Sequence, residues 1–496
     1  MRKTLALLLL ILFPGSLLAQ TTIPPVRTLV LTHVTVIDVT GAPSSCDMTV
    51  IVEGNRIAAV GKASKIKIPK DAQVVDARGK FLIPGLWDMH VHTLREERVG
   101  TFFPLFIANG VTGVRDMAMP LGNLELLKQW RKEIQDGRRV GPRIFASGPI
   151  LGGAIPQIRF PISTEAEARQ AVVTLKQRGA DFIKVHSLLP RPLFFVVADE
   201  ARKQGLTFVG HVPASVTAAE ASDAGQKSME HLYGILESCS ANEAEVRKEV
   251  EQAANNPDTW SAWGAIVRTT DRLYGRQARE KTYSKAKCAA LFARFVRNGT
   301  WQCPTLVMRR ALALREDESF RNDARQRYIP QSELKGWTAR TDTRNVNLAA
   351  EEITNRKIRL EKETDLVGDM HRAGVKILAG TDLGNPYVYP GFSLHDELAL
   401  LVQAGLTPLE ALQSATINPA KFLDLENELG TIEKGKLADM VLLDGDPLAD
   451  INNTRKINAV ILNGILLDRA ALDKLLSGVE MAVRSSTAIP SSPAAK

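Results

Sequence analysis

Side chains that can bind a metal ion stand at the ends of several short apolar runs in this chain. They are His90, His92, Lys184, His211, His231 and Asp382. The runs have the length and composition of buried strands. Residues two apart on a strand point to the same side, so the imidazoles of His90 and His92 can bind one ion. Nitrogen and oxygen donors of this kind suit zinc or a neighbouring divalent ion.

Strand-like runs alternate with helical patterns through the middle of the chain. The runs lie at residues 82–88, 112–115, 143–146, 181–185, 207–209, 228–230, 301–304 and 375–379. Alternation of this kind is typical of parallel α/β folds, and eight strands close a barrel. The candidate ligands fall at the C-terminal ends of the runs, where (β/α)8 barrels carry their catalytic residues. The sequence therefore predicts an α/β fold with a (β/α)8 TIM barrel over residues 81–424.

From about residue 28 to about residue 470 the chain resembles the amidohydrolase superfamily. The similar segments are, in chain order, residues 84–92, 182–184, 210–211, 230–231, 380–382 and 430–443. Within the superfamily the chain is most similar to dipeptidases, prolidase-like enzymes and relatives of imidazolonepropionase. The resemblance implies metal-dependent hydrolysis on a distorted eight-stranded α/β barrel.

The resemblance also implies roles for the candidate ligands. His90 and His92 would hold one ion with Asp382, and His211 and His231 would hold the second. A protonated lysine would repel both cations. Lys184 can therefore bridge them only as a carbamate formed with carbon dioxide, as in two-metal members of the family. Asp382 has the role of proton shuttle in the family. Some members use one ion and no carbamate, and the sequence leaves that alternative open.

Three further residues are candidates for contact with a substrate. Tyr233 could donate a hydrogen bond to a developing oxyanion, as a tyrosine of this region does in related peptidases; a packing role is the alternative. His186 points the same way as Lys184 and either lines the pocket or packs behind it. Arg159 is a candidate for binding a substrate carboxylate. The third-strand loop that ends at Arg159 lacks a histidine that many dipeptidases of this branch carry, and this puts dipeptide specificity in doubt.

These features predict an exported, binuclear, zinc-dependent amidohydrolase that cleaves an amide C–N bond in a dipeptide or an N-acyl amino acid. The first alternative is a mononuclear cyclic-amide hydrolase or deaminase of the imidazolonepropionase type. The second is a non-catalytic periplasmic protein that binds a metal or a ligand. The expected partner is a small molecule with a carboxylate. No basic run with interleaved aromatics suggests nucleic-acid binding, and a homo-oligomer is compatible with the sequence.

The N-terminus has the pattern of a secretory signal peptide over residues 1–19. Arg2 and Lys3 precede an apolar run from Leu5 to Phe13, and Ala19 offers a small residue for cleavage. The run is shorter than the roughly 20 residues needed to span a bilayer. We expect a periplasmic or secreted protein with no stable membrane insertion after cleavage.

The rest of the chain divides around the barrel. Residues 20–80 and 425–476 show short alternating strands, and we expect both parts to join in one small composite β-sandwich. Charged helical patterns at about 236–298 and 308–370 predict insertions over the catalytic face. Residues 477–496 are expected to be disordered. Cys239 and Cys288 bracket the first insertion and could pair, whereas Cys46 and Cys303 are expected to be free and buried.

Overall fold

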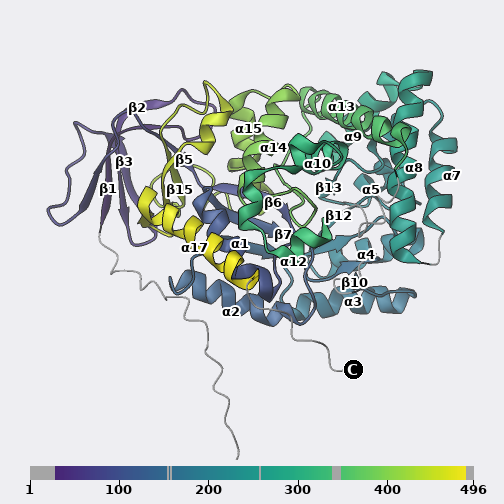
Figure 1. Cartoon of the computed structure of the whole chain (residues 1–496), viewed down its shortest axis with the longest axis horizontal. Coiled ribbons are helices and arrows are strands. Elements are labelled where there is room, and N and C mark those ends of the chain that lie inside the picture. Colours follow the sequence, from purple (N-terminus) through teal and green to yellow (C-terminus); the bar gives the residue numbers. More distant parts are fainter. Residues whose placement is uncertain (1–27, 154–155, 157–158, 256–257, 338–347, 488–496) are drawn as a thin grey trace, which may run out of the picture.

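The computed structural model describes residues 28–153, 156, 159–255, 258–337 and 348–487. The predicted signal peptide at residues 1–19 lies outside this range. A strand-rich part built from both ends of the chain lies at one end of the molecule, and helices of the first insertion lie at the other (Figure 1). Among the described residues, no helix combines the length and apolar character that a membrane span requires.

The strand-rich part is one sheet shared by the two ends of the chain. Its strands are β1 (Leu29–Val36), β2 (Ser45–Glu53), β3 (Arg56–Lys62), β4 (Gln73–Asp76), β5 (Phe81–Pro84), β15 (Met440–Leu443), β16 (Ile457–Leu462) and β17 (Ile465–Leu467). The order is β17-β16-β15-β5-β1-β2-β3, and β4 also pairs with β1. Antiparallel pairing of β15 with β5 joins the two chain ends. The apolar alternation therefore builds a composite β-domain around a core of its own, as expected.

The barrel strands form two parallel sheets. One contains β6 (Leu86–Val91), β7 (Val111–Asp116) and β8 (Arg143–Ala146). The other contains β9 (Ile150–Leu151), β10 (Arg159–Phe160), β11 (Phe182–Val185), β12 (Thr207–Gly210), β13 (Ser228–Glu230) and β14 (Trp301–Cys303). The amide of Asp181, just before β11, donates to the carbonyl of Ala146 in β8 at 2.9 Å and links the two sheets.

A segment without regular strand assignment closes the ring between β14 and β6. On one side, Gln302 donates to the carbonyl of Lys376 and accepts from the amide of Leu378, both at 2.9 Å. On the other side, Met89 donates to Ala379 at 2.9 Å and Asp382 donates to His90 at 2.8 Å. The predicted run at 375–379 thus occupies the place of the eighth barrel strand.

The predicted first run, residues 82–88, divides between the two domains. Its first part belongs to β5 in the terminal sheet, and its second part opens the barrel in β6. Gly85 lies at the boundary, where a Cβ atom would come within 2.1 Å of the Thr112 hydroxyl oxygen. Only glycine lets the chain pass this close to β7 as it changes sheet.

Helices surround the barrel and fill both insertions. Those of the barrel and the C-terminal region are α1 (Glu96–Ala108), α2 (Asn123–Gln135), α3 (Glu165–Arg178), α4 (Arg191–Lys203), α5 (Ala218–Asp223), α14 (Phe392–Gln403), α15 (Pro408–Ser414), α16 (Ile417–Phe422) and α17 (Arg469–Thr487). The first insertion holds α6 (Ile235–Ser238), α7 (Glu243–Ala254), α8 (Thr259–Glu280) and α9 (Lys285–Asn298). The second holds α10 (Leu306–Leu314), α11 (Glu318–Arg321), α12 (Gln331–Gly336) and α13 (Ala350–Arg372). Helices thus make up most of the described part of both segments.

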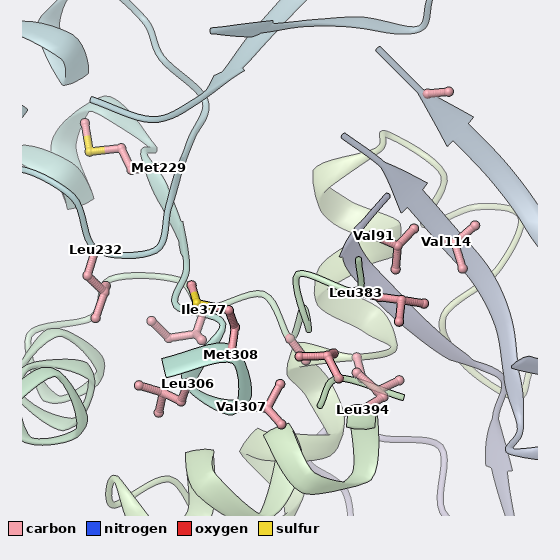
Figure 2. Close-up of a cluster of buried hydrophobic side chains, with 14 of the residues drawn as sticks. Val91, Val114, Met229, Leu232, Leu306, Val307, Met308, Ile377, Leu383 and Leu394 are labelled. Carbon is pink, nitrogen blue, oxygen red and sulfur yellow. The ribbon is translucent and has the colours of Figure 1, made fainter. Parts of the chain in front are cut away.

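The main hydrophobic core joins the barrel strands to the helices around them. Figure 2 shows part of it, where Val91 of β6 and Met229 of β13 lie with side chains of α10 and α14. Ile377 and Leu383, from the segment that closes the ring, belong to the same cluster. The C-terminal ends of the strands are thus anchored by packing, which gives the side chains that follow them fixed positions.

Two predictions are wrong, one for the C-terminal tail and one for the burial of Cys46. Residues 478–487 continue helix α17 rather than forming a disordered tail, because Val479 and Val483, one helical turn apart, pack against Leu105 of α1. Residues 488–496 lie outside the described range. Cys46 is free but exposed, not buried, since it lies in the exposed first part of β2; Cys303 is free and buried as expected.

Candidate metal centre

Five of the six candidate ligands lie within one cluster of contacts at the C-terminal end of the barrel. His90 lies near the end of β6 and His92 follows the strand, and the ring centroids of these two residues are 5.3 Å apart. His211 follows β12 and His231 follows β13; their ring centroids are 5.0 Å apart. The rings of His90 and His231 lie 4.5 Å apart and join the two pairs. The strand ends thus bring together residues that are far apart in the sequence.

Asp382 lies among these histidines. One oxygen of its carboxylate is 3.1 Å from Nε2 of His92 and 3.4 Å from Nε2 of His90. The other oxygen is 3.7 Å from Nδ1 of His231. Although burial opposes ionisation, the surrounding imidazoles and Lys184 lower the pKa of the Asp382 carboxyl. It is therefore a carboxylate at neutral pH, able to bind a cation or to accept a proton.

Lys184 reaches the centre from β11. Its side chain is almost fully buried, and Nζ has no hydrogen-bond partner among the described residues. Burial lowers the pKa of Lys184 to about 8. The neighbouring backbone makes room for it: a Cβ atom on Gly210, which has φ +132°, would lie 3.0 Å from Cδ of Lys184 and 2.3 Å from the carbonyl oxygen of Val185.

Several residues at the strand ends adopt left-handed backbone conformations. His231 has φ 61°, Leu232 has φ 58°, Thr305 has φ 51° and Asp382 has φ 57°. Such conformations are uncommon for residues with a Cβ atom, and they persist where the surrounding structure imposes them. Here they turn His231 and Asp382 toward the centre immediately after their strands.

His90, His211 and His231 are uncharged at neutral pH. Burial lowers the pKa of His90 to about 4, and it lowers the pKa values of His211 and His231 well below the ordinary histidine value. A neutral imidazole is the form that binds a metal ion. The electrostatics of the site therefore favour metal coordination over a cluster of imidazolium ions.

Each of three histidines has one ring nitrogen held by a neighbour outside the ligand set. Nδ1 of His90 lies 2.8 Å from a carboxylate oxygen of Glu230. Nδ1 of His211 lies 3.0 Å from the Ser187 hydroxyl, and Nδ1 of His231 lies 2.7 Å from the Thr305 hydroxyl. Partners of this kind fix ring orientation at metal sites.

The residues present fit a metal centre. Nε2 of His90, Nδ1 of His92 and Nζ of Lys184 are buried polar atoms with no hydrogen-bond partner among the described residues. Ligand atoms of His90, His231 and Asp382 lie within 4.8 Å of one another. Buried polar atoms are costly without partners, and a divalent cation would satisfy these donors together.

Tyr233 and His186 lie on the His211 side of the cluster. The ring of Tyr233 is 5.0 Å from that of His211 and 5.4 Å from that of His231. The ring of His186 is 4.5 Å from that of His211. Burial raises the pKa of Tyr233, so its hydroxyl remains a hydrogen-bond donor at neutral pH.

Trp263 of α8 brings the first insertion into the centre. Its ring is 4.8 Å from that of His186 and 5.4 Å from that of Tyr233, and it stacks on His211 at 5.5 Å. A small pocket adjoins this side, and its walls include Tyr233, Val212 and Ile266 together with the charged Glu237 and Arg247. The insertion is therefore part of the wall of the site.

Arg159 occupies β10, which pairs with β9 at the third-strand loop, and it is half-buried. Among the described residues it has no hydrogen bond or ion pair with the histidine cluster. Arg309 of α10 is closer to the centre: it donates to the carbonyl of His231 at 3.0 Å and lies 4.8 Å from the Tyr233 ring.

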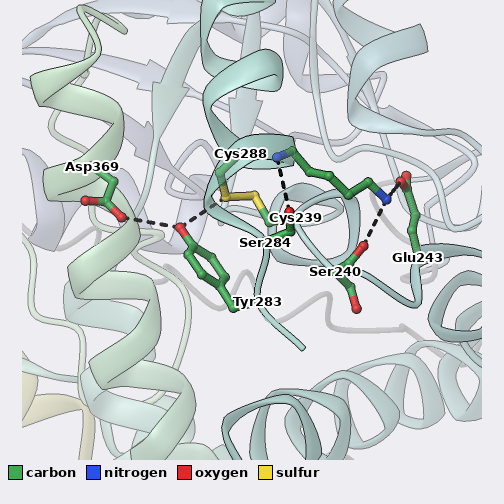
Figure 3. Close-up of a disulfide and its surroundings, with 8 residues drawn as sticks. Cys239, Ser240, Glu243, Tyr283, Ser284, Cys288 and Asp369 are labelled. Carbon is green, nitrogen blue, oxygen red and sulfur yellow. Dashed lines mark hydrogen bonds and ion pairs between the residues drawn. A yellow bond between two sulfur atoms is a disulfide. The ribbon is translucent and has the colours of Figure 1, made fainter. Parts of the chain in front are cut away.

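A disulfide bond joins the end of α6 to α9 within the first insertion. Cys239, directly after α6, is bonded to Cys288 of α9, the pairing considered from the sequence. Figure 3 shows Tyr283 beside it, with its hydroxyl 3.1 Å from the Cys288 sulfur and 3.3 Å from an Asp369 oxygen. Lys287 donates to the Ser240 carbonyl at 2.9 Å and to Glu243 at 2.7 Å. The bond thus anchors the segment that carries Trp263.

No functional role is predicted from the sequence for Glu230, Arg115 or Trp263. The sequence does contain a signal for Glu230 and Arg115. Both are charged residues inside apolar strands, and such residues are rarely buried unless they are paired. Trp263 offered no such signal, since it lies in a long insertion whose path over the barrel cannot be read from local pattern.

Comparisons with known proteins agree with this geometry. A model of the amidohydrolase family matches residues 81–467. An imidazolonepropionase from Sphingopyxis alaskensis is 43% identical over 90 residues, which is 17% of this chain and 22% of that protein. The chain thus spans less than a quarter of the length of this curated relative.

Solved structures share the fold over most of the chain. A Xaa-Pro dipeptidase with bound methionine in its active site has a TM-score of 0.62 at 20% identity, covering 89% of this chain and 100% of that one. Bottromycin amidohydrolase has a TM-score of 0.68 at 23% identity, covering 92% and 91%.

Proposed function

Because this chain belongs to the amidohydrolase family, we propose that it is a metal-dependent hydrolase that cleaves the amide C–N bond of a small molecule. The surroundings of Asp382 are the main support for this proposal. The Asp382 carboxylate lies within 3.7 Å of ring nitrogens of His90, His92 and His231. Beside it lies the buried Lys184 amine, which has no hydrogen-bond partner in the described part of the chain. This donor set suits two divalent ions, and zinc is the metal we propose.

The ions would be held as follows. His90 and His92 with Asp382 would bind the first, and His211 and His231 would bind the second. Lys184 would bridge them as a carbamate: its neutral amine bonds to the carbon of carbon dioxide and releases one proton. Nζ is buried and has no hydrogen-bond partner within the described ranges, which supports this assignment. When bound, the metal pair lowers the pKa of water to about 7 and polarises the carbonyl under attack.

The chain's own residues would move the proton and hold the substrate. Asp382 would accept a proton from the attacking water and deliver it to the leaving nitrogen. Tyr233 would donate a hydrogen bond to the carbonyl oxygen as negative charge develops there. His186 and Trp263, whose rings lie against that of His211, would line the substrate pocket on this side.

Dipeptides and N-acyl amino acids are the proposed substrates. The dipeptidase-like fold supports the amide bond, and Arg159 at the third-strand loop is our candidate for the substrate carboxylate. A mononuclear cyclic-amide hydrolase or deaminase is the second candidate function, because the sequence relatives include imidazolonepropionase.

We also propose that the protein is exported. The basic and apolar N-terminus has the pattern of a signal peptide. The Cys239–Cys288 disulfide supports this, because such bonds persist in oxidising compartments.

A substrate screen tests the proposal. The zinc-loaded protein is assayed against dipeptides, N-acyl amino acids, cyclic amides and lactones, with the chelator-treated protein as control. We expect metal-dependent release of amine from linear amides. Turnover of cyclic amides or deamination alone would favour the second candidate, and no metal-dependent turnover of any class would contradict hydrolase activity.

The carboxylate is tested on the best amide substrate. Its C-terminal carboxamide should have at least about tenfold lower kcat/KM, which corresponds to about 1.4 kcal/mol of transition-state binding. Arg159→Gln should then lower kcat/KM for the free acid and leave the carboxamide unchanged. Equal rates for the two substrates would exclude recognition of this group.

A further inference from the structure

A buried ion pair inside the barrel contacts one of the candidate metal ligands from behind. We infer that Glu230, held by Arg115, is a positioning residue that fixes His90 with Nδ1 protonated and Nε2 free to bind metal. The inference rests on the proposed function, since it concerns how the chain prepares one ligand for the ion.

The polar atoms of Arg115 in β7 and Glu230 in β13 are nearly all hydrogen-bonded. Both residues are fully buried. Arg115 donates from Nη2 to the two oxygens of Glu230 at 3.0 and 3.2 Å, and from Nε to the Met89 carbonyl at 2.6 Å. The Ser228 hydroxyl donates to one oxygen of Glu230 at 2.5 Å and accepts from Nη1 of Arg115 at 3.0 Å. The carboxylate therefore has a fixed position and a compensated charge.

The other oxygen of Glu230 faces Nδ1 of His90 at 2.8 Å. A carboxylate only accepts hydrogen bonds, so Nδ1 must carry the proton. A neutral imidazole has a single N–H, and Nε2 of His90 is then left with a lone pair. This Nε2 is buried, has no hydrogen-bond partner among the residues that the structure describes, and faces Asp382 at 3.4 Å. The tautomer selected by Glu230 is thus the one that the metal centre requires.

Glu230 is better placed as a support than as a ligand. Its oxygens lie near the Cys303 sulfur and a His90 nitrogen, a grouping that resembles a metal site. However, the guanidinium of Arg115 lies 3.0 Å from the same carboxylate and would repel a cation there. The guanidinium also supplies the charge that keeps the carboxylate paired in a buried position.

A glutamine at this position would create a conflict between donors. Its amide has one accepting oxygen, whereas Arg115, Ser228 and His90 all donate to the present carboxylate. Either the amide NH2 faces Arg115 and Ser228, or it faces Nδ1 of His90 and forces the proton onto Nε2. Both arrangements weaken the orientation of His90 as a ligand.

The tautomer can be measured in the unaltered protein. Nitrogen-15 NMR of histidine-labelled, metal-free protein reports which ring nitrogen is protonated, and the His90→Gln variant assigns the signal. We expect Nδ1–H and unprotonated Nε2 for His90 at neutral pH. The opposite tautomer would overturn the inference, and because the wild-type chain is used the result does not depend on a variant folding.

Metal affinity gives a second measurement. Glu230→Gln should bind zinc about 10- to 100-fold more weakly in competition with a chelator, and its cobalt-substituted form should show an altered absorption spectrum. The matched control is Glu200→Gln on α4, which also alters a buried glutamate paired with an arginine, Arg169, at 3.1 Å. This control should bind zinc like the wild type.

The outcomes separate the two proposals. If the wild-type protein does not bind zinc through His90, the proposed function fails. If the wild type binds zinc and Glu230→Gln binds it equally well with an unchanged cobalt spectrum, the metal centre stands and the role of Glu230 is overturned.

Discussion

The Asp382 carboxylate lies 3.1 Å from Nε2 of His92, although the two residues are supplied by the last and the first strand positions of the barrel. The backbone joins them as well, since the amide of His92 donates to the carbonyl of Leu383 at 2.8 Å. Ring closure between these strands therefore sets the geometry of the proposed proton shuttle.

Replacement of Asp382 by asparagine should separate proton transfer from binding. Asn keeps the shape but cannot take up a proton, so kcat should fall by about 10²- to 10⁴-fold, the usual contribution of a positioned acid/base. The histidines should retain much of the metal. Steady-state kinetics with metal analysis of the same sample measures both. Normal turnover would remove Asp382 from the mechanism.

Tyr233→Phe tests the hydroxyl against the packing role. The substitution keeps the ring contacts with His211 and His231 and removes only the donor. If the hydroxyl stabilises the oxyanion, kcat should fall by about 10²- to 10³-fold with an unchanged Tm. A kcat within twofold of the wild type would leave Tyr233 with packing alone.

Removal of the disulfide should destabilise the fold. Cys239 and Cys288 are 49 residues apart in sequence, and a loop of that size corresponds to about 4 kcal/mol in the chain-entropy model. We expect the Cys239→Ser/Cys288→Ser variant to unfold at lower denaturant concentration. The Cys46→Ser variant, which alters an exposed free cysteine, is the control. Equal midpoints for both variants would show that the bond does not stabilise the chain.

The stability of the metal-free protein should depend on His395 at acidic pH. This buried side chain lies with Nδ1 2.9 Å from the Thr454 hydroxyl and Nε2 3.0 Å from the Asn109 carbonyl. Burial lowers its pKa to about 4 from the ordinary 6.5. Below pH 6.5 the unfolded chain binds a proton that the folded chain does not, so stability is complete above pH 6.5 and decreases toward pH 4.

His395→Gln should reduce this dependence by about one proton. Denaturant unfolding at a series of pH values measures the slope of the unfolding free energy. A slope identical to that of the wild type would show that His395 is not responsible for it.

Residue types at strand ends were sufficient to predict the barrel and the cluster of candidate ligands. His90, His211 and His231 could be chosen because each follows an apolar run, and parallel strands bring such ends together. The roles of Arg115 and Glu230 could not be assigned, because their pairing depends on strand register across the barrel. Trp263 depends on the path of a long insertion, which local pattern does not determine.

The end of the last helix could not be predicted from amino-acid composition. Its Ser, Pro and Ala content suggested disorder from residue 477, yet Val479 and Val483 extend the helical spacing of the preceding residues. Packing of these two residues against Leu105 stabilises the helix despite this composition. Local composition therefore predicted the wrong boundary, whereas periodicity would have placed it later.

The proposed function requires a two-metal centre bridged by Lys184. The most direct measurement is a crystal structure of zinc-loaded protein, prepared in bicarbonate, with anomalous diffraction recorded at the zinc edge. We predict two zinc peaks per chain, one at His90, His92 and Asp382 and one at His211 and His231, with density for a carboxylated Lys184 between them. A single peak beside an unmodified lysine amine, in fully active protein, would contradict the two-metal centre.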